Sequence, residues 1–219
     1  NIPASREGTG LEVDKFSKAA FKSHYDAYIT NVINKVKQVA PNAIHTLEID
    51  SYEVGTQNWT HGYEQQFQQQ YGYDLTPFLP LFAGKFVGSS ATSESVLWDT
   101  RDFNNQLITE NYYGYFTELA HQDGIQTYLE PYGSGPFNEL DVAKQADFPM
   151  GEFWLDNNNF RIAASSSTAN IYDKPLVSAE AFTQFPGNNW LFSPAMGKPD
   201  NAKSWALGVI QHVFHRFAH

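Results

Sequence analysis

The sequence predicts an α/β protein built as an incomplete (β/α)8 TIM-barrel, and three observations support this prediction. Segments of strand-like composition alternate with segments of helical periodicity, which is the pattern of βαβ units and a parallel sheet. Several strand-like segments end in a carboxylic acid, and the carboxyl ends of barrel strands converge on one face. No glycine-rich phosphate turn follows the first strand, which disfavours an open doubly wound sheet.

The composition bounds the size and the partners of the protein. The chain has 219 residues, of which 42% are hydrophobic and 16% aromatic, so residues 1–219 are expected to form a single domain with a sizeable core. A formal charge of −10 disfavours a nucleic-acid partner, and no apolar run approaches the roughly 20 residues of a membrane span. The absence of cysteine excludes disulfides and thiolate metal sites.

The expected elements alternate along the chain. Helices are expected where apolar residues recur every three to four positions, and strands where β-branched and aromatic residues run between turn signals. The long insertion after the second strand is typical of a loop that shapes a site. In order, the sequence predicts a strand end at 11–13, a helix at 19–39, a strand at 44–52, a helical piece at 61–71, a proline-punctuated piece at 75–82, a helix at 95–121, a strand at 125–130, a short helix at 139–145, a strand at 147–153, a helix at 160–172, a strand at 176–182, a helix at 202–210 and a strand at 213–217.

Counting back from the chain end assigns these strands to places in the barrel. If 213–217 is the eighth strand, then 11–13 is the third, so approximately strands 3 to 8 are present. A complete barrel needs about 250 residues, so the chain is expected to be the C-terminal part of a barrel with an open hydrophobic edge. The strands between these two each end in a glutamate. From the seventh strand back to the fourth, these are Glu180, Glu152, Glu130 and Glu53.

The strand at 44–52 and its continuation, read as IHTLEIDSYEVG, carry more acids than a turn needs. Strict alternation of side chains would put Asp50 on one face of the sheet and Glu53 on the other. Glu53 can join Asp50 in one cleft only if the extended backbone breaks near Ser51-Tyr52. A solvated turn is the alternative interpretation of these acids.

Two carboxyl groups on either side of a sugar ring are the chemistry of glycoside hydrolysis, in which one group is protonated and the other ionised. Glu53 and Glu180 fit by position, because the fourth and seventh strands stand on opposite sides of the barrel mouth. A separation of about 5 Å would favour direct attack by Glu180 with retention, and one of roughly 6.5 to 9.5 Å would admit a water and favour inversion. The sequence leaves both outcomes open.

Four carboxylates around one mouth repel each other, so a hard cation with oxygen ligands is expected there, with Ca²⁺ as the best match. Glu152 and Glu130 are the candidates left for it. Glu130 is also a candidate for contact with the substrate, although it precedes Pro131 at a strand end, where an acid commonly just accepts hydrogen bonds.

Other residues near strand ends are candidates for contact with a sugar. Trp59, Tyr132, Trp154 and Trp190 are candidate platforms for the apolar faces of pyranose rings, although packing explains each of them as well. His215 in the last strand would point into the mouth or pair with an acid. Asp50 would bind a sugar hydroxyl or act as a structural acid.

Seven motifs stand in order along nearly the whole chain. They are LEVDKFS, IDSYEVGTQNWT, YGYDLTPFLP, ENYYGYFTELAHQDGIQTYLEPYG, DFPMGEFW, SAEAF and VFHRFAH. Together they resemble the α-L-rhamnosidases of glycoside hydrolase family 106. The resemblance implies part of a large multidomain bacterial enzyme with a (β/α)8 catalytic barrel, an inverting mechanism and dependence on Ca²⁺.

The resemblance also implies roles for particular residues. Glu53 in DSYEVG corresponds to the general acid, Glu180 in SAEAF to the general base, and Glu152 in GEFW to a Ca²⁺ ligand near the sugar hydroxyls. The implied substrate is a terminal α-L-rhamnose on an oligosaccharide or polysaccharide. The implied location is periplasmic or secreted, and further domains of the same chain are expected. The alternatives are a retaining glycosidase of the broad barrel clan and a non-catalytic sugar-binding remnant of a barrel.

Overall fold

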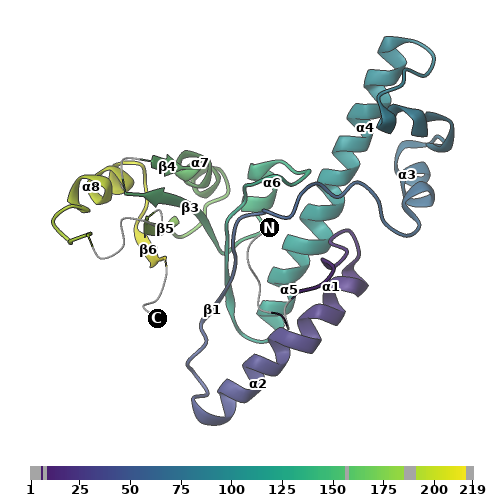
Figure 1. The fold of residues 1–219 in the computed structure, drawn as a ribbon. Coiled ribbons are helices and arrows are strands. Elements are labelled where there is room, and N and C mark those ends of the chain that lie inside the picture. Colours follow the sequence, from purple (N-terminus) through teal and green to yellow (C-terminus); the bar gives the residue numbers. More distant parts are fainter. Residues whose placement is uncertain (1–5, 7–8, 156–157, 185–190, 216–219) are drawn as a thin grey trace.

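Five parallel strands form a curved sheet that corresponds to about half of a barrel (Figure 1). The structure is a computed structural model that describes residues 6, 9–155, 158–184 and 191–215. The strands stand in the order β1-β2-β3-β5-β6, so strands that follow one another in the chain are neighbours in the sheet, as in a (β/α)8 barrel. Their bounds are β1 Thr46–Ile49, β2 Gln126–Leu129, β3 Phe148–Trp154, β5 Ser178–Thr183 and β6 Gln211–Phe214.

This arrangement confirms the predicted fold class, with two corrections. Residues 11–13 form no strand, and Leu11 is fully exposed, so the prediction of a third barrel strand there is wrong. Three residues of which two, Leu11 and Val13, are apolar carry too little information to specify a strand, because a strand needs a neighbouring strand to pair with. The second correction is the short strand β4 (Asn158–Phe160), which pairs antiparallel with β3 where a helix was expected to begin.

Two long helices pack beside the β1 end of the sheet, and each contains a π-helical turn. The first comprises α1 (Lys18–His24), η2 (Tyr25–Ile29) and α2 (Thr30–Val39). The Ser17 side chain accepts a hydrogen bond from the Ala20 backbone N–H, which is a standard N-cap and explains why the helix begins there.

The second long helix comprises α4 (Ser90–Ile108), η4 (Thr109–Gly114) and α5 (Tyr115–Gln122). Ser89 caps it by accepting from the Thr92 N–H. The sequence predicted both helices but not their π-turns. The remaining helices are α3 Tyr63–Tyr71, η3 Thr76–Ala83, α6 Glu139–Ala143, α7 Ile162–Ile171 and α8 Lys198–Ala206. No helix among the described residues is long and apolar enough to cross a lipid bilayer.

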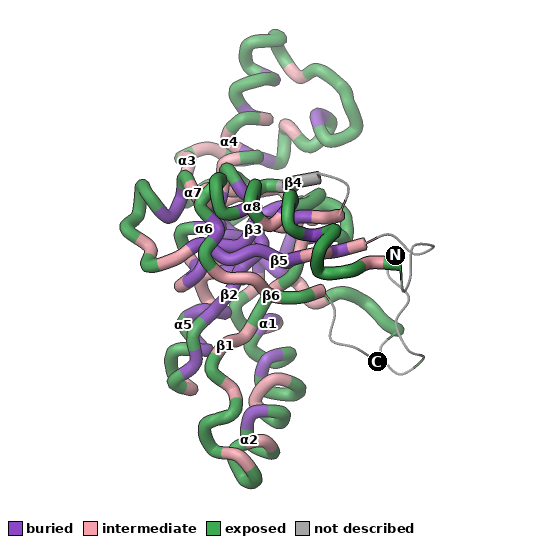
Figure 2. Tube along the Cα trace, turned by 90° about the vertical axis from the view of Figure 1, so that its left-hand side faces the viewer, coloured by how far each residue is buried: buried purple, intermediate pink, exposed green. Residues whose placement is uncertain are grey.

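Buried residues are concentrated along β2, β3 and β5, whereas most residues of α2 and α3 are exposed (Figure 2). A large aromatic cluster, which includes Tyr63, Phe67 and Phe116, joins the helices to β1 and β2. A second cluster around Phe153 and Ile162 lies between β3, β5 and α7. The helices therefore cover one face of the sheet, and the opposite, concave face is left for chemistry.

Candidate active site

The concave face of the sheet carries acids on four neighbouring strands. Glu152 of β3 and Glu180 of β5 are paired in the parallel register, so their side chains leave the sheet side by side on the same face. Tyr128 and Glu130 continue this face on β2 and just beyond it, and Glu48 is paired with Tyr128 across β1 and β2. Period-two alternation thus collects the acids at the carboxyl ends of the strands, as the sequence predicted.

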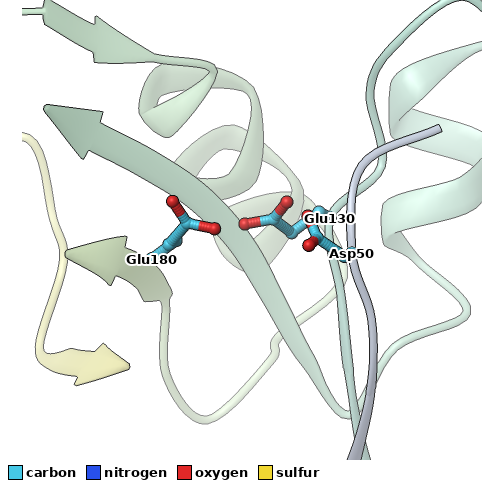
Figure 3. Close-up of side chains that lie close together, drawn as sticks. All are labelled: Asp50, Glu130 and Glu180. Atoms are coloured by element: carbon cyan, nitrogen blue, oxygen red, sulfur yellow. The ribbon is translucent and has the colours of Figure 1, made fainter. Parts of the chain in front are cut away.

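Three of these carboxylates form a compact group. Each of Asp50, Glu130 and Glu180 offers an oxygen that lies within 4.8 Å of the oxygens of the other two. Figure 3 shows the carboxyl groups of Glu130 and Glu180 pointing toward each other, with Asp50 beside Glu130. Glu130 is 0% exposed and Glu180 is 7% exposed, whereas Asp50 is open to solvent. We call these three residues the carboxylate cluster.

The backbone leaves regular strand geometry directly after β1. Ile49 is paired with Leu129, but Tyr52 is paired with Gly133. The segment after β2 therefore contains one residue more between these two pairs than the segment after β1. In between, the Ser51 N–H donates to Glu130 Oε2 at 3.0 Å instead of to a backbone carbonyl. The break expected at Ser51-Tyr52 is confirmed.

Gly133 makes this junction possible. Its φ is +125°, and a Cβ at this position would lie 2.1 Å from the Tyr52 carbonyl oxygen. Only glycine tolerates both the backbone conformation and the close approach. We call the segment where Ser51 and Tyr52 meet Glu130 and Gly133 the β1–β2 junction.

Glu53 emerges from the β1–β2 junction at the rim of the concave face. Its carboxylate is exposed, and Oε1 accepts a hydrogen bond from Ser51 Oγ at 3.0 Å. Tyr52, which precedes Glu53, packs in the aromatic cluster together with Leu47 and Ile49, so Glu53 leaves the backbone on the opposite, concave side. The broken backbone therefore brings Glu53 to the face that carries Asp50.

Burial and mutual repulsion hold protons on several of these acids. Burial, followed by the neighbouring Asp50, raises the pKa of Glu130 to about 11. Burial, followed by the charge of Glu180, raises the pKa of Glu152 to about 7. Burial and the charge of Asp50 raise the pKa of Glu48 to about 7. The face thus holds more carboxylates than it can ionise without a positive partner.

Glu180 has two polar neighbours, of which the sequence singled out His215 but not Thr183. Thr183 Oγ1 donates a hydrogen bond to Glu180 Oε1, and His215 Nδ1 lies 3.9 Å from the same oxygen. His215 was a candidate for the mouth or for an ion pair, and the structure brings it to the acid. Thr183 was missed because regular alternation places it on the opposite face from Glu180.

Comparison with known proteins assigns the chain to a family. The sequence pattern of the alpha-L-rhamnosidase family, glycoside hydrolase family 106, matches residues 1–219. The chain belongs to this family. The resemblance seen in the seven motifs is therefore confirmed.

Two relatives show how the chain compares with longer proteins. A rhamnosidase from Novosphingobium sp. PP1Y has a structure that matches 98% of the chain with a TM-score of 0.85 and 30% sequence identity. A protein of Formosa agariphila that carries the provisional name of a beta-glucuronidase is 37% identical over the whole chain. The chain covers 22% of the first protein and 19% of the second, so it spans about a fifth of the length of each.

The carboxylate cluster fits the Ca²⁺ that resemblance to family 106 implies. Its three side chains supply only carboxylate oxygens, which are the ligands that Ca²⁺ prefers. Glu130 Oε1 is buried without a hydrogen-bond partner, and such an orphaned acceptor is explained if a cation binds it. Glu152, the ligand expected from the sequence, lies beside Glu180 but is not a member of the cluster. Its role as a ligand stays a prediction.

The aromatic candidates differ in what they contact. Trp59 is half-buried and stacks on Tyr63 with ring centroids 4.6 Å apart. Tyr132 is 1% exposed, and burial, followed by the charge of Glu130, raises the pKa of its hydroxyl. Trp154 is half-buried at the end of β3, and its hydrogen bond lowers the pKa of Glu152. Tyr132 and Trp154 therefore each lie beside an acid, and the contact of all three with sugar stays a prediction; Trp190 lies outside the described residues.

Proposed function

We propose that this chain is part of the catalytic barrel of an inverting α-L-rhamnosidase that releases terminal α-L-rhamnose from an oligosaccharide or polysaccharide. The observation that supports it most is the convergence of Glu53 and the carboxylate cluster at the carboxyl ends of neighbouring strands, in a chain of family 106. Acids from different strands at this end of a barrel are the usual location of barrel chemistry.

The two catalytic roles are those that the resemblance to family 106 implies, and the positions of the two acids support them. Glu53 is the general acid: it gives its proton to the glycosidic oxygen as the bond from that oxygen to the anomeric carbon breaks. Glu180 is the general base: it takes a proton from the water whose oxygen forms the new bond to the anomeric carbon from the opposite side. Glu53 is at the exposed rim, where a leaving group can depart, and Glu180 is nearly buried.

Asp50 and Glu130 would hold Ca²⁺, with Glu180 at the border between the cation and the water. When bound, Ca²⁺ supplies positive charge and oxygen-binding capacity next to the sugar hydroxyls. Ser51 orients two of these acids, because its backbone N–H donates to Glu130 and its hydroxyl donates to Glu53. A periplasmic or secreted location stays a prediction from the resemblance.

A glucuronide is a second candidate substrate, because a relative carries the name of a beta-glucuronidase. Such a sugar has its own carboxylate. The concave face carries Glu48, Glu152 and the carboxylate cluster, and like charges at short range repel. This acidity favours a neutral deoxy sugar over a uronic acid.

The test uses Glu53→Gln and Glu180→Gln in the full-length protein, with aryl α-L-rhamnosides and an aryl glucuronide as substrates. Each variant should lower kcat/KM on a rhamnoside with a poor leaving group by about 10²- to 10⁴-fold. Glu53→Gln should spare a rhamnoside with a good leaving group, since such a group needs no proton, and Glu180→Gln should not. Glu94→Gln, an exposed acid in α4, is the matched control.

Proton NMR of the first product decides the stereochemistry. Inversion gives β-L-rhamnose from an α-L-rhamnoside, whereas a retaining enzyme gives the α anomer. Unchanged rates in both glutamine variants would refute the assignment of the acids. Faster turnover of the glucuronide than of the rhamnoside would refute the proposed substrate.

A further inference from the structure

The carboxyl end of β5 contains a bulge with a residue in an unusual backbone conformation. Phe153 of β3 is paired with Ala181, but the next residue, Trp154, is paired with Thr183, so Phe182 is one extra residue on β5. Its φ is +61°, in the left-handed region that bulky residues rarely adopt. The ladder resumes beyond it, because the Leu155 N–H donates to the Thr183 carbonyl at 2.9 Å.

The bulge exchanges the faces to which two side chains point. Without it, Phe182 would share the concave face with Glu180, and Thr183 would point to the helices. With it, the Phe182 ring packs edge-on against Phe153 at 4.9 Å and stacks on Phe214 at 5.5 Å. Phe153 belongs to the cluster under α7, so the Phe182 ring lies on the helix-covered side of the sheet.

Thr183 takes the place on the concave face that Phe182 gives up. It is 1% exposed, and its hydroxyl donates to Glu180 Oε1. Because His215 Nδ1 lies 3.9 Å from the same oxygen, the carboxylate of Glu180 is held from two sides. A bulky ring beside this acid is thus replaced by a hydrogen-bond donor.

We propose that the Phe182 bulge is a positioning device and that Thr183 is a positioning residue for the general base. Thr183 fixes the orientation of the Glu180 carboxylate, and Phe182 keeps Thr183 on the concave face by adopting the left-handed conformation. Strained backbone of this kind persists only where the surrounding structure enforces it, and bulges next to active sites commonly re-aim a side chain. This inference rests on the proposed role of Glu180.

The first test compares Thr183→Val with Thr183→Ser in the full-length protein at saturating Ca²⁺, so that a change in cation affinity does not alter the rates. Valine has the shape of threonine without the donor, and serine keeps the donor. Losing a hydrogen bond to a charged group should lower kcat about 10- to 100-fold, with KM within about two-fold because substrate binding is not touched. Thr183→Ser should retain kcat within about three-fold of the unmodified protein.

Thr168→Val is the matched control. Thr168 is equally buried, but its hydroxyl donates to the Ala164 carbonyl within α7, away from the acids. The kcat of Thr168→Val should stay within about two-fold of the unmodified protein, because the lost hydrogen bond lies within α7. The two Thr→Val changes remove the same hydroxyl group, so they differ only in the place of the loss.

The second test exploits the backbone of Phe182. Asparagine tolerates a positive φ, whereas a β-branched residue there is a genuine outlier. Phe182→Asn should therefore retain more kcat than Phe182→Val, even though valine is the closer match in hydrophobicity. Packing alone predicts the opposite order, because the Phe182 ring contacts Phe153 and Phe214.

Several results would overturn the inference. They are an unchanged kcat in Thr183→Val, a loss in Thr183→Ser as large as in Thr183→Val, and a greater kcat in Phe182→Val than in Phe182→Asn. If Thr183→Val does not fold, the serine variant and the two Phe182 variants decide. If Glu180→Gln is inactive and Thr183→Val is fully active, only the positioning role fails. If Glu180→Gln is fully active, the proposed function fails first.

Discussion

The β1–β2 junction and the Phe182 bulge are two irregularities in the pairing of parallel strands, and a different type of residue adopts the unusual backbone conformation at each. Each inserts one extra residue into a pair of parallel strands, and each does so next to an acid of the carboxylate cluster. At the first, the unusual φ falls on a glycine, Gly133, which adopts it with little strain. At the second it falls on Phe182, where strain of about 1–3 kcal/mol is expected.

The difference shows what each site requires. At Gly133 the neighbouring backbone itself fills the space of a side chain, so glycine is demanded by contact. At Phe182 a glycine would relieve the backbone, but the ring fills a place between Phe153 and Phe214. The first junction is fixed by close approach of two backbones, and the second balances backbone strain against packing.

Gly133→Ala should break the first junction and have the largest effect. The new Cβ would lie 2.1 Å from the Tyr52 oxygen at a φ of +125°, so Tyr52 and Glu53 must move. Unfolding should become easier by about 2–4 kcal/mol, measured by thermal unfolding of the full-length protein, and activity should be lost. The control is Gly124→Ala, which also has a positive φ but nothing within 4 Å. Equal losses in the two variants would show that the clash is unimportant.

Glu130→Gln should change the stability by an intermediate amount. Whether the variant is more or less stable than the unmodified protein should depend on Ca²⁺. In the presence of EDTA the variant should be more stable by about 1–3 kcal/mol, because Glu130, whose pKa burial raises to about 11, must take up a proton when the protein folds at neutral pH, whereas an amide needs none. With Ca²⁺ the unmodified protein should gain stability and the variant should gain little. Melting temperatures with and without Ca²⁺ test this, and Glu118→Gln on the surface of α5 is the control. A variant that responds to Ca²⁺ like the unmodified protein would exclude Glu130 as a ligand.

Ser51→Ala should have the smallest effect. It removes the hydroxyl that donates to Glu53 Oε1 but keeps the backbone N–H that donates to Glu130. An exposed hydrogen bond contributes about 0.5–1.5 kcal/mol, so kcat/KM on an aryl rhamnoside should fall only about 2- to 10-fold. A loss as large as that expected for Thr183→Val would contradict the view that Glu53 is held more loosely than Glu180.

The sequence was sufficient to predict the alternation of strands and helices and the acids at the strand ends. Both follow from apolar periodicity, which is local information. It also predicted the break at Ser51-Tyr52, because Glu53 and Asp50 could not otherwise share a face. The strand at 11–13 was wrong, since such a short run depends on a pairing partner.

What the sequence could not provide is the geometry that depends on neighbouring strands. The role of Thr183 requires a bulge at Phe182, and nothing in the motif SAEAF marks a residue in the left-handed region. Grouping Glu130 with Asp50 and Glu180 rather than Glu152 depends on the curvature of the sheet and on the direction of side chains. Both are properties of tertiary structure rather than of periodicity.

Among the described residues, no strand pairs with the outer edge of β1 or with that of β6, so within this segment each edge has backbone groups with which a further strand, of the same protein or of another copy, can pair. A second copy that placed its β1 beside β6 would keep the parallel order and present a new free β6. Two copies would bring ten parallel strands, five from each, whereas a barrel of this class closes with eight. The isolated segment therefore resembles a bifunctional monomer in polymer chemistry, because each of its two free sheet edges can pair with another copy. Its self-association would continue as an open chain, since no ring of matching size closes it.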